Sequence, residues 1–251
     1  EGVRDIGVIQ ADHSMTNAAM PVQIASIQTL SRRSIPPADV VLVDEAHVVF
    51  KLFKTWMVDS AWAKVPFIGL SATPWTKGLS KLYDDLIIAA TTQELIDKGF
   101  LAQFKVFAPP SGRSPDLSGV KTVAGDYHEG QLSKAMSNAD LIADAVETWQ
   151  ALGENRPTFC FGVDCAHAQK LQNEFLGAGI STEYIDADTP LPERQAIRDR
   201  FHSGATKVVC SIGCLTLGVD WDVRCISFCR PTKSEMLFVQ IIGRALRTAQ
   251  G

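Results

Sequence analysis

The fold of this chain is constrained most by a regular alternation between short apolar runs and segments of helical or turn character. The apolar runs of the first half read IGVIQ, VQIAS, VVLVD and FIGLS. In the second half, the strand candidates read TFCFG, STEYID, KVVCSIG and RCISFCR. They alternate with helices predicted over residues 138–152, 165–179, 191–204 and 234–247. Such alternation is typical of α/β proteins, in which helices cover the faces of parallel sheets.

A segment rich in proline, serine and glycine separates the two halves. It runs from Ala108 to Gly125, reads APPSGRSPDLSGVKTVAG and has the composition of a linker. A chain of 251 residues is long enough for two domains of ordinary size. We therefore predict a first domain over 1–107, a linker over 108–125 and a second domain over 126–251.

The bulk composition restricts the expected partners and compartment. A net charge of −4 gives no overall basic character, so any contact with nucleic acid has to come from a local groove. The longest apolar runs are too short to cross a bilayer. The opening EGVRDIGVIQ has no charged region followed by an apolar stretch, as a secretory signal would have. We expect a cytoplasmic protein without membrane contact.

All six cysteines fall in the second half, and four of them form two C-x₃-C pairs. This spacing is not that of a zinc ribbon, and most of the cysteines lie in or beside apolar strand-like runs, where a thiol behaves as a small hydrophobe. We expect buried thiols, with a zinc or iron site as the alternative. The cysteines are Cys160, Cys165, Cys210, Cys214, Cys225 and Cys229.

Two carboxylates follow one of the apolar runs without a gap. The run Val40–Val43 predicts a short, fully buried strand, and Asp44 and Glu45 come directly after it. In open α/β sheets, ligands bind at the carboxyl ends of the strands. A carboxylate there can hold Mg²⁺ through water while its neighbour orients an attacking water. The alternative is a solvated turn after a core strand, because short motifs also occur by chance.

Polar residues also gather after the strand FIGL and on the last predicted helix. Ser71 and Thr73 follow the strand, where hydroxyl groups can bond to neighbouring carboxylates or backbone. Gln240, Arg244 and Arg247 stand at i, i+4 and i+7, so a helix would present all three on one face. Arginines on an otherwise apolar helix need a partner. The alternative is a salt-bridged face at the surface.

A further group of charges lies on or after the predicted helix 191–204. Basic and acidic residues are mixed there, which favours a solvated face over a nucleic-acid site. The residues are Glu193, Arg194, Arg198, Asp199, Arg200 and Lys207.

In order and spacing, the motifs DEAH, SAT, T-x-G-x-D and Q-x-x-G-R-x-x-R resemble the motor core of superfamily 2 helicases and translocases of the DEAD/DEAH group. The resemblance covers essentially the whole chain. It implies two RecA-like parallel-sheet lobes, the first incomplete at its N-terminus. The stretches GDYHEGQL and PTFCFG also look like DNA-repair translocases and restriction-enzyme motor subunits. Leu217 and Asp222 depart from the pattern, since related proteins often carry Glu and Pro there.

The resemblance implies ATP and Mg²⁺ as cofactors and assigns roles at the ATP site. Asp44 resembles the ligand that holds Mg²⁺ through water, Glu45 the base that orients the hydrolytic water, and His47 a link across the cleft. Arg244 and Arg247 resemble arginine fingers, which stabilise charge on the transferring phosphoryl group. The remaining catalytic residue implied is their neighbour Gln240.

The resemblance also implies residues that couple ATP to nucleic acid and residues that contact the strand. The coupling residues are Ser71, Thr73, Gly218 and Asp220. Strand phosphates would be contacted, without base specificity, by Ser26, Thr29, Thr189 and Thr216.

An ATP motor also needs a phosphate-binding loop of the form G-x-x-x-x-G-K-[ST], and the 251 residues contain no such stretch. We expect a helicase or translocase core whose intact parent moves on DNA in preference to RNA, whereas this chain alone is deficient in ATP hydrolysis. The alternative is a nucleotide-independent module that binds or anneals nucleic acid. The incomplete first lobe would expose an apolar sheet edge or face and favour self-association.

Overall fold

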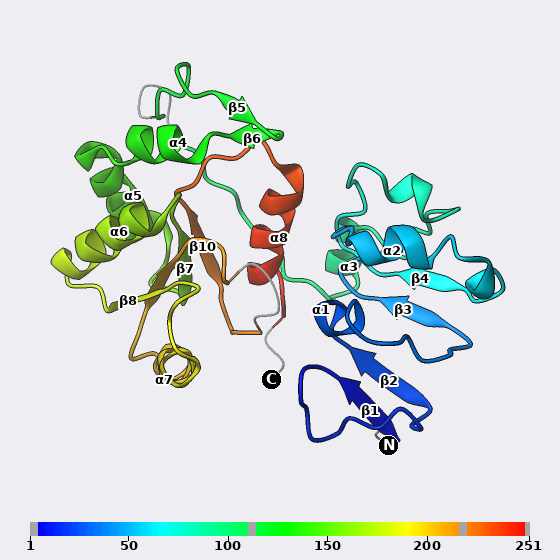
Figure 1. Cartoon of the computed structure of the whole chain (residues 1–251). Helices are drawn as coiled ribbons and strands as arrows, with labels where there is room; N and C mark the ends of the chain where they lie inside the picture. Colours follow the sequence, from blue (N-terminus) through cyan, green and yellow to red (C-terminus); the bar gives the residue numbers. More distant parts are fainter. Residues whose placement is uncertain (1–4, 110–113, 216–219, 249–251) are drawn as a thin grey trace. The chain divides into compact units, whose positions relative to one another are not determined.

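In the computed structural model, which describes residues 5–109, 114–215 and 220–248, the chain divides into two compact units (Figure 1). Unit 1 comprises Glu1–Ile87 and unit 2 comprises Ile88–Gly251. Unit 1 therefore ends earlier than the predicted limit of 107, and the contacts assign the predicted linker 108–125 to unit 2. The predicted domain limits remain a prediction.

Unit 1 consists of two parallel strand pairs with short helices. Its strands are β1 (Ile6–Ile9), β2 (Val22–Ala25), β3 (Val41–Val43) and β4 (Phe67–Gly69). Its helices are α1 (Ile27–Leu30), α2 (Lys51–Trp56) and the 3₁₀ turns η1 (Ser60–Trp62) and η2 (Leu79–Lys81). β1 pairs with β2, and β3 pairs with β4. Each strand lies in one of the apolar runs, so the sequence predicts these strands correctly.

The core of unit 1 is rich in aromatic side chains. Val43, Phe53 and Trp56 are buried in one cluster. The Trp56 ring meets Trp62 and Phe67 edge to face, with ring centroids 5.1 and 5.2 Å apart. Aromatic pairs in this geometry contribute about 0.5–1.5 kcal/mol beyond the area they bury. This cluster fixes α2 and η1 beside β3 and β4.

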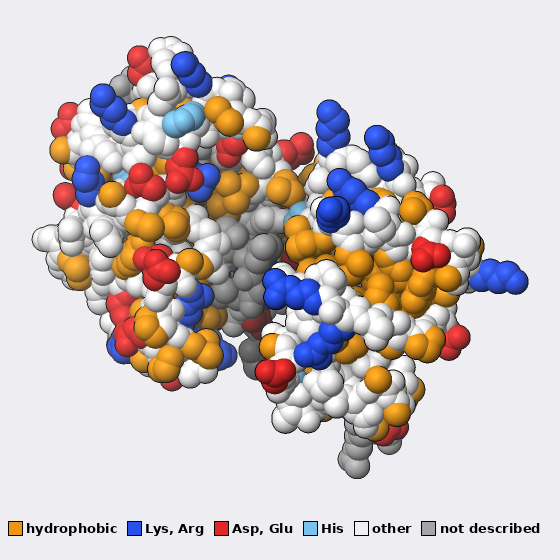
Figure 2. Space-filling model, viewed as in Figure 1, with side chains coloured by type: hydrophobic (Ala, Val, Ile, Leu, Met, Phe, Trp, Pro, Cys, Tyr) orange, Lys and Arg blue, Asp and Glu red, His pale blue; other side chains and the backbone are white. Residues whose placement is uncertain are grey.

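The other face of β3 and β4 is exposed. Leu42 is 65% exposed, Ile68 47% and Leu70 52%, and Figure 2 shows apolar side chains gathered in this region of unit 1. The prediction of a fully buried strand at Val40–Val43 is therefore wrong. Successive side chains of a strand point to opposite faces, and only the side of Val43 packs on the core of unit 1.

Unit 2 is built on a four-stranded, fully parallel sheet in the order β10-β7-β9-β8. The strands are β7 (Thr158–Phe161), β8 (Thr182–Ile185), β9 (Val208–Ser211) and β10 (Cys225–Phe228). The helices are α3 (Thr92–Asp97), α4 (Glu129–Met136), α5 (Ala139–Leu152), α6 (Cys165–Gly177), α7 (Leu191–His202) and α8 (Glu235–Ala245). α6 connects β7 to β8 and α7 connects β8 to β9, as is usual between parallel strands.

Helices cover both faces of this sheet, which is why its strands read as continuous apolar runs. On one face, Cys160 of β7 packs with α5 and α6, for example with Leu171. On the other face, Phe159 of β7 packs with α7 and α8, through Phe201 and Ile241. The predicted helices are confirmed within a few residues of their limits.

A short antiparallel hairpin, β5 (Thr122–Val123) and β6 (Asp126–Tyr127), precedes α4 in unit 2 (Figure 1). Near it, Leu117 and Val120 of the predicted linker pack against the buried Leu132 of α4. At the far end of α8, the backbone N–H of Ala102 donates to the carbonyl of Leu246 at 2.8 Å. The segment after α3 and the hairpin are thus both integrated into unit 2.

Candidate functional site

The loop that follows β3 carries the acidic pair in a constrained backbone. The N–H of Glu45 donates to Asp44 Oδ1 at 2.9 Å, and the N–H of Ala46 donates to the carbonyl of Leu70 at 2.9 Å. Glu45 itself has φ +49°, in the left-handed region that a residue with a side chain rarely adopts. A non-glycine residue held there costs on the order of 1–3 kcal/mol and tends to mark a functional position.

A buried polar link joins this loop to the loop after β4. His47 is 3% exposed, and its Nδ1 lies 3.0 Å from Ser71 Oγ and 3.3 Å from Glu45 Oε2. Ser71 Oγ in turn accepts from the backbone N–H of Thr73 at 3.0 Å. Thr73 is completely buried, and its hydroxyl has no hydrogen-bond partner among the described residues. The structure thus brings four predicted residues of two motifs, Glu45, His47, Ser71 and Thr73, into one network.

Close packing at Gly69 holds the two loops together, which sequence reasoning missed. A Cβ atom placed on Gly69 would lie 2.7 Å from Cζ of Tyr83 and 2.8 Å from Cβ of Ala46. Burial raises the pKa of the Tyr83 hydroxyl. The only available signal was a glycine two residues before the start of the SAT motif.

The predicted strand contacts of unit 1, Ser26 and Thr29, lie at the start of α1. Ser26 caps the helix by accepting from the N–H of Thr29 at 3.3 Å, and Thr29 Oγ1 accepts from the N–H of Ala11 at 3.0 Å. Thr29 lines a pocket of about 270 Å³ together with Arg32 and Arg33. Two basic side chains therefore accompany the predicted hydroxyl group.

In unit 2, Thr189 lies in an ordered turn after β8. Its Oγ1 donates to Asp186 Oδ1 and accepts from the Asp186 N–H, both at 3.0 Å. Arg194 donates to the carbonyls of Thr189 and Asp186 at 2.8 and 2.7 Å. These hydrogen bonds fix the conformation of the turn after β8 without a ligand.

The arginine helix ends earlier than predicted. Gln240 and Arg244 lie on α8, but the helix stops at Ala245, with Leu246 as its C-cap. Arg247 instead forms an isolated antiparallel bridge with Leu101. The prediction that all three polar residues share one helical face is wrong for Arg247, because the bond between Ala102 and Leu246 leads the backbone out of the helix.

Arg247 forms an ion pair with Asp220, so the structure connects two predicted motifs of unit 2. Two other predicted residues, Thr216 and Gly218, lie outside the described residues. Asp44, Glu45 and His47 belong to unit 1, whereas Gln240, Arg244 and Arg247 belong to unit 2.

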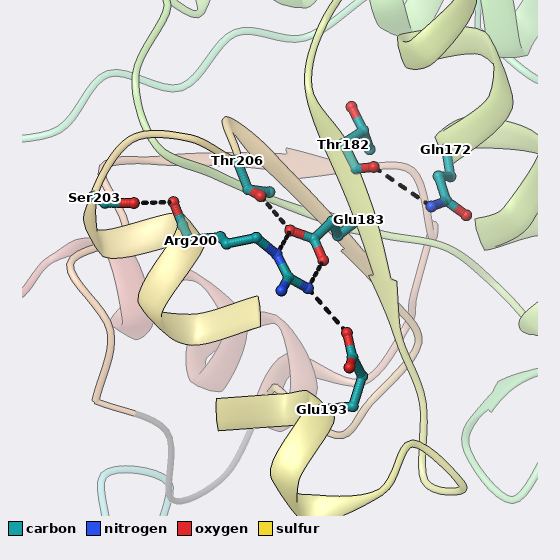
Figure 3. A network of polar contacts seen from close by, with 7 residues as sticks. All are labelled: Gln172, Thr182, Glu183, Glu193, Arg200, Ser203 and Thr206. Carbon is teal, nitrogen blue, oxygen red and sulfur yellow. Dashed lines mark hydrogen bonds and ion pairs between the residues drawn. The ribbon is translucent and has the colours of Figure 1, made fainter. Parts of the chain in front are cut away.

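Two of the predicted mixed charges around α7, Glu193 and Arg200, form a salt-bridged network with Glu183 (Figure 3). Arg200 Nε and Nη2 donate to the two carboxylate oxygens of Glu183 at 2.9 and 2.6 Å, and Nη2 also donates to Glu193 at 2.9 Å. Hydrogen bonds from Arg200, together with one from the Thr206 hydroxyl, hold the pKa of Glu183 below its usual range. These partners already occupy the Arg200 guanidinium.

The expectation of buried thiols holds for only some of the six cysteines. Cys160, Cys210 and Cys229 are buried, and the Cys160 and Cys229 sulfurs lie 3.9 Å apart. Cys165 is exposed, contrary to the expectation. Within residues 5–109, 114–215 and 220–248, no three histidine, cysteine or acidic side chains are grouped as a metal site.

Comparison with known proteins identifies the class. Residues 140–249 match the helicase conserved C-terminal domain. A Saccharomyces cerevisiae protein with the name "Putative ATP-dependent helicase IRC3" is 34% identical over 242 residues, which cover 90% of this chain and 35% of that protein. A 51.5 kDa protein of a Lactococcus phage is 30% identical over 190 residues, which cover 74% of this chain and 41% of that protein. The chain thus spans well under half the length of either relative.

The fold also resembles that of a solved structure. S. cerevisiae Dbp5 bound to RNA and ADP BeF3 has a TM-score of 0.55 at 14% identity, covering 96% of this chain and 60% of that one. The family match and the similarity to IRC3 support a superfamily 2 helicase C-terminal lobe at residues 140–249. The predicted α/β fold with RecA-like architecture is confirmed.

Proposed function

We propose that this chain is the core of a superfamily 2 helicase or translocase that couples ATP hydrolysis to movement on DNA. The observation that carries the proposal is the buried link from His47 through Ser71 to the Thr73 backbone. This link joins the acidic loop to the loop after β4, so it would transmit a change at one loop to the other. The helicase C-terminal domain at 140–249 supports the same assignment.

The acidic loop has the donor chemistry that Mg²⁺ requires, because the ion prefers carboxylate and water oxygens. Asp44 would hold the ion through water, and Glu45, whose side chain is 43% exposed, would orient the hydrolytic water. Bound ATP would supply the phosphoryl group, and Mg²⁺ would neutralise part of its charge. His47 would keep Glu45 in place through their 3.3 Å contact.

Unit 2 would contribute positive charge through Arg244 on α8 and Arg247 just after the helix, with Gln240 one turn before Arg244. Arginine fingers accelerate phosphoryl transfer by about 10³–10⁵. Since Arg247 is paired with Asp220, it would exchange this carboxylate for a phosphoryl oxygen. Asp220 would thus bind Arg247 while no phosphoryl group is present and release it when ATP binds.

Nucleic acid would bind through phosphate contacts from both units. Ser26 and Thr29 in unit 1 and Thr189 in unit 2 would provide hydroxyl and backbone groups, as would Thr216. Such contacts do not select bases, and they make binding weaker as salt increases.

The direct test measures the affinity of the chain for single- and double-stranded DNA and for RNA, with and without ATP and Mg²⁺. We expect salt-dependent binding, with DNA preferred over RNA. Affinity that responds to nucleotide supports the motor, whereas binding that ignores nucleotide favours a binding or annealing module. Absence of strand binding at low salt excludes both.

ATP hydrolysis by the 251 residues alone should be very low, because they contain no phosphate-binding loop sequence. Phosphate release by the chain should match that of its Glu45→Gln variant. Robust release that disappears in the variant would contradict this reasoning.

The exposed apolar face of β3 and β4 supports self-association as a further property. Contiguous apolar surface of this kind marks interaction sites or aggregation.

No helix in the described part of the chain is long and apolar enough to cross a membrane. We propose a cytoplasmic location, which imaging of the tagged protein would test.

A further inference from the structure

A pocket of about 290 Å³ lies at the carboxyl edge of the unit 2 sheet. Residues that follow all four strands line it, and the first residue of α4 closes one side. The lining residues are Glu129, Val163, Ala187, Ile212, Gly213, Cys214 and Arg230. In open α/β sheets this edge is the usual place for a ligand.

Arg230 is the basic residue of the pocket, and its guanidinium has a donor without a hydrogen-bond partner among the described residues. The side chain is partly buried, and its Nε is buried without a hydrogen-bond partner among the described residues. No ion pair involves Arg230 within the described part of the chain. Leaving a buried polar group unsatisfied costs about 1–3 kcal/mol, and more for a charged group. Arg230 therefore has an unsatisfied donor that an anionic partner would satisfy.

Asp126 interacts electrostatically with Arg230, but its carboxylate oxygens accept hydrogen bonds from other residues. Asp126 accepts from the Thr232 hydroxyl at 2.7 Å and from the backbone N–H groups of Lys233 and Tyr127, both at 2.8 Å. The charge of Arg230 helps to lower the pKa of Asp126, but the two groups form no ion pair. The Arg230 guanidinium therefore remains available on the pocket side.

The remaining walls fit one phosphate group of an extended strand. Among the described residues, nothing lies within 4 Å of a Cβ atom placed on Gly213, so no described side chain fills this part of the wall. Val163, Ala187 and Ile212 offer no competing charge. Glu129 is exposed and places a carboxylate at the rim, which would weaken the capture of a free anion. A strand held also by other contacts tolerates this repulsion, whereas a lone phosphate ion binds weakly.

We propose that Arg230 binds a backbone phosphate of the nucleic-acid strand in this pocket. Arginine presents its donors in a planar fork that matches two phosphate oxygens. This inference rests on the proposed function and names a strand-contacting cation in unit 2. Thr189 and Thr216, by contrast, would offer only hydroxyl and backbone groups.

The test compares matched variants in binding a fluorescent 20-nucleotide single-stranded DNA between 50 and 200 mM salt. Arg230→Gln should weaken binding by roughly tenfold and reduce the slope of log affinity against log salt by about 0.7, the value for one phosphate contact on a single strand. Arg230→Lys should keep the slope but lose part of the affinity. Glu129→Gln should strengthen binding by about twofold to threefold, because it removes a charge that repels phosphate.

Arg224→Gln is the control, because Arg224 stands at the opposite end of β10 and is paired with Asp222 at 3.0 and 2.9 Å. It removes the same charge without touching the pocket and should have little effect. Circular dichroism melts of all variants check that the fold is preserved. Equal slopes for Arg230→Gln, Arg224→Gln and the wild type would overturn the inference while leaving the proposed function intact.

A second measurement separates the two failures. The Nε–Hε NMR signal of Arg230, assigned by its loss in Arg230→Lys, is followed during titration with inorganic phosphate. If the wild-type chain binds no strand, the proposed function fails and this titration alone decides the site. A shift at the Arg230 signal then upholds a phosphate site, and an unmoved signal overturns it.

Discussion

Replacement of Asp126 should loosen the helix that carries the predicted arginine finger. The Asp126 carboxylate joins the β5–β6 hairpin to the start of α8 by accepting from the Thr232 hydroxyl and the Lys233 backbone. Lys233 Nζ also donates to Thr122 Oγ1 at 2.6 Å and lies 4.7 Å from the centre of the Tyr127 ring. Asp126→Ala removes the centre of this clamp.

The expected magnitude follows from the hydrogen bonds that Asp126 accepts. Hydrogen bonds to a charged group contribute about 1.5–3 kcal/mol each. Because the carboxylate is only partly buried, we take the lower value for the two bonds to α8, which gives ~3 kcal/mol. For a unit of this size, 1 kcal/mol shifts the melting temperature by about 2–4 °C, so Asp126→Ala should lower it by about 6–12 °C.

The pH dependence of this difference provides a second check. Burial alone would raise the pKa of Asp126, but the bonds from Lys233, Thr232 and Tyr127, with the charge of Arg230, hold it below its usual value. A lowered carboxylate pKa stabilises the fold above the unfolded pKa, and the stabilisation is lost as pH falls through the folded pKa. The gap between wild type and variant should therefore narrow below about pH 4.

Melts by circular dichroism and hydrogen exchange of the Lys233 amide measure these effects. Asp116→Ala is the control, since Asp116 is an exposed carboxylate of unit 2 that accepts from the backbone N–H of nearby Ser118 at 2.9 Å. If Asp126→Ala melts within 1 °C of Asp116→Ala and leaves exchange at Lys233 unchanged, the clamp does not support α8 and the reasoning is wrong.

Local features of the two units lead to three further expectations. Burial lowers the pKa of His167, so as pH falls the unfolded chain protonates this histidine before the folded chain does. Between pH 7.5 and 5.5 the melting temperature of the wild type should therefore fall more than that of His167→Asn. Parallel plots of melting temperature against pH would contradict this. Gly69→Ala forces a methyl group against Tyr83 and should cost about 1–3 kcal/mol in urea unfolding; an unchanged midpoint would show that the ring simply moves aside. Leu42→Lys should shift sedimentation profiles toward monomer, with exposed Val58→Lys as the control; if the wild type is already monomeric, self-association is excluded.

The sequence predicts unit 2 well because both faces of its sheet are buried. A strand such as β7, with every residue buried, has to be apolar throughout, and that pattern is visible without coordinates. The exposure of Leu42 in unit 1 was not predictable in the same way, because an apolar run looks identical whether one face or both are covered. The end of α8 was also missed, since it depends on the distant backbone of Ala102.

The acidic loop was identified by its residue types, but its geometry was not. The left-handed backbone of Glu45 and the contact between Gly69 and Tyr83 arise from tertiary packing, which no local pattern records. The same holds for Asp126, whose partners on the α8 side lie more than a hundred residues later in the chain. Motifs thus locate the chemistry, whereas the side chains that position it come from long-range contacts.

α8 is held at both ends by residues that flank the predicted linker 108–125. At the start of the helix, Asp126 binds Thr232 and the Lys233 backbone. At its end, Ala102 binds Leu246, and Arg247 pairs with Asp220. Any displacement of the segments around residues 101–102 and 122–127 therefore acts on the helix that carries Gln240 and Arg244. These flanking segments are thus part of the support for α8, and changes in them should alter the arginine helix before they alter the central sheet.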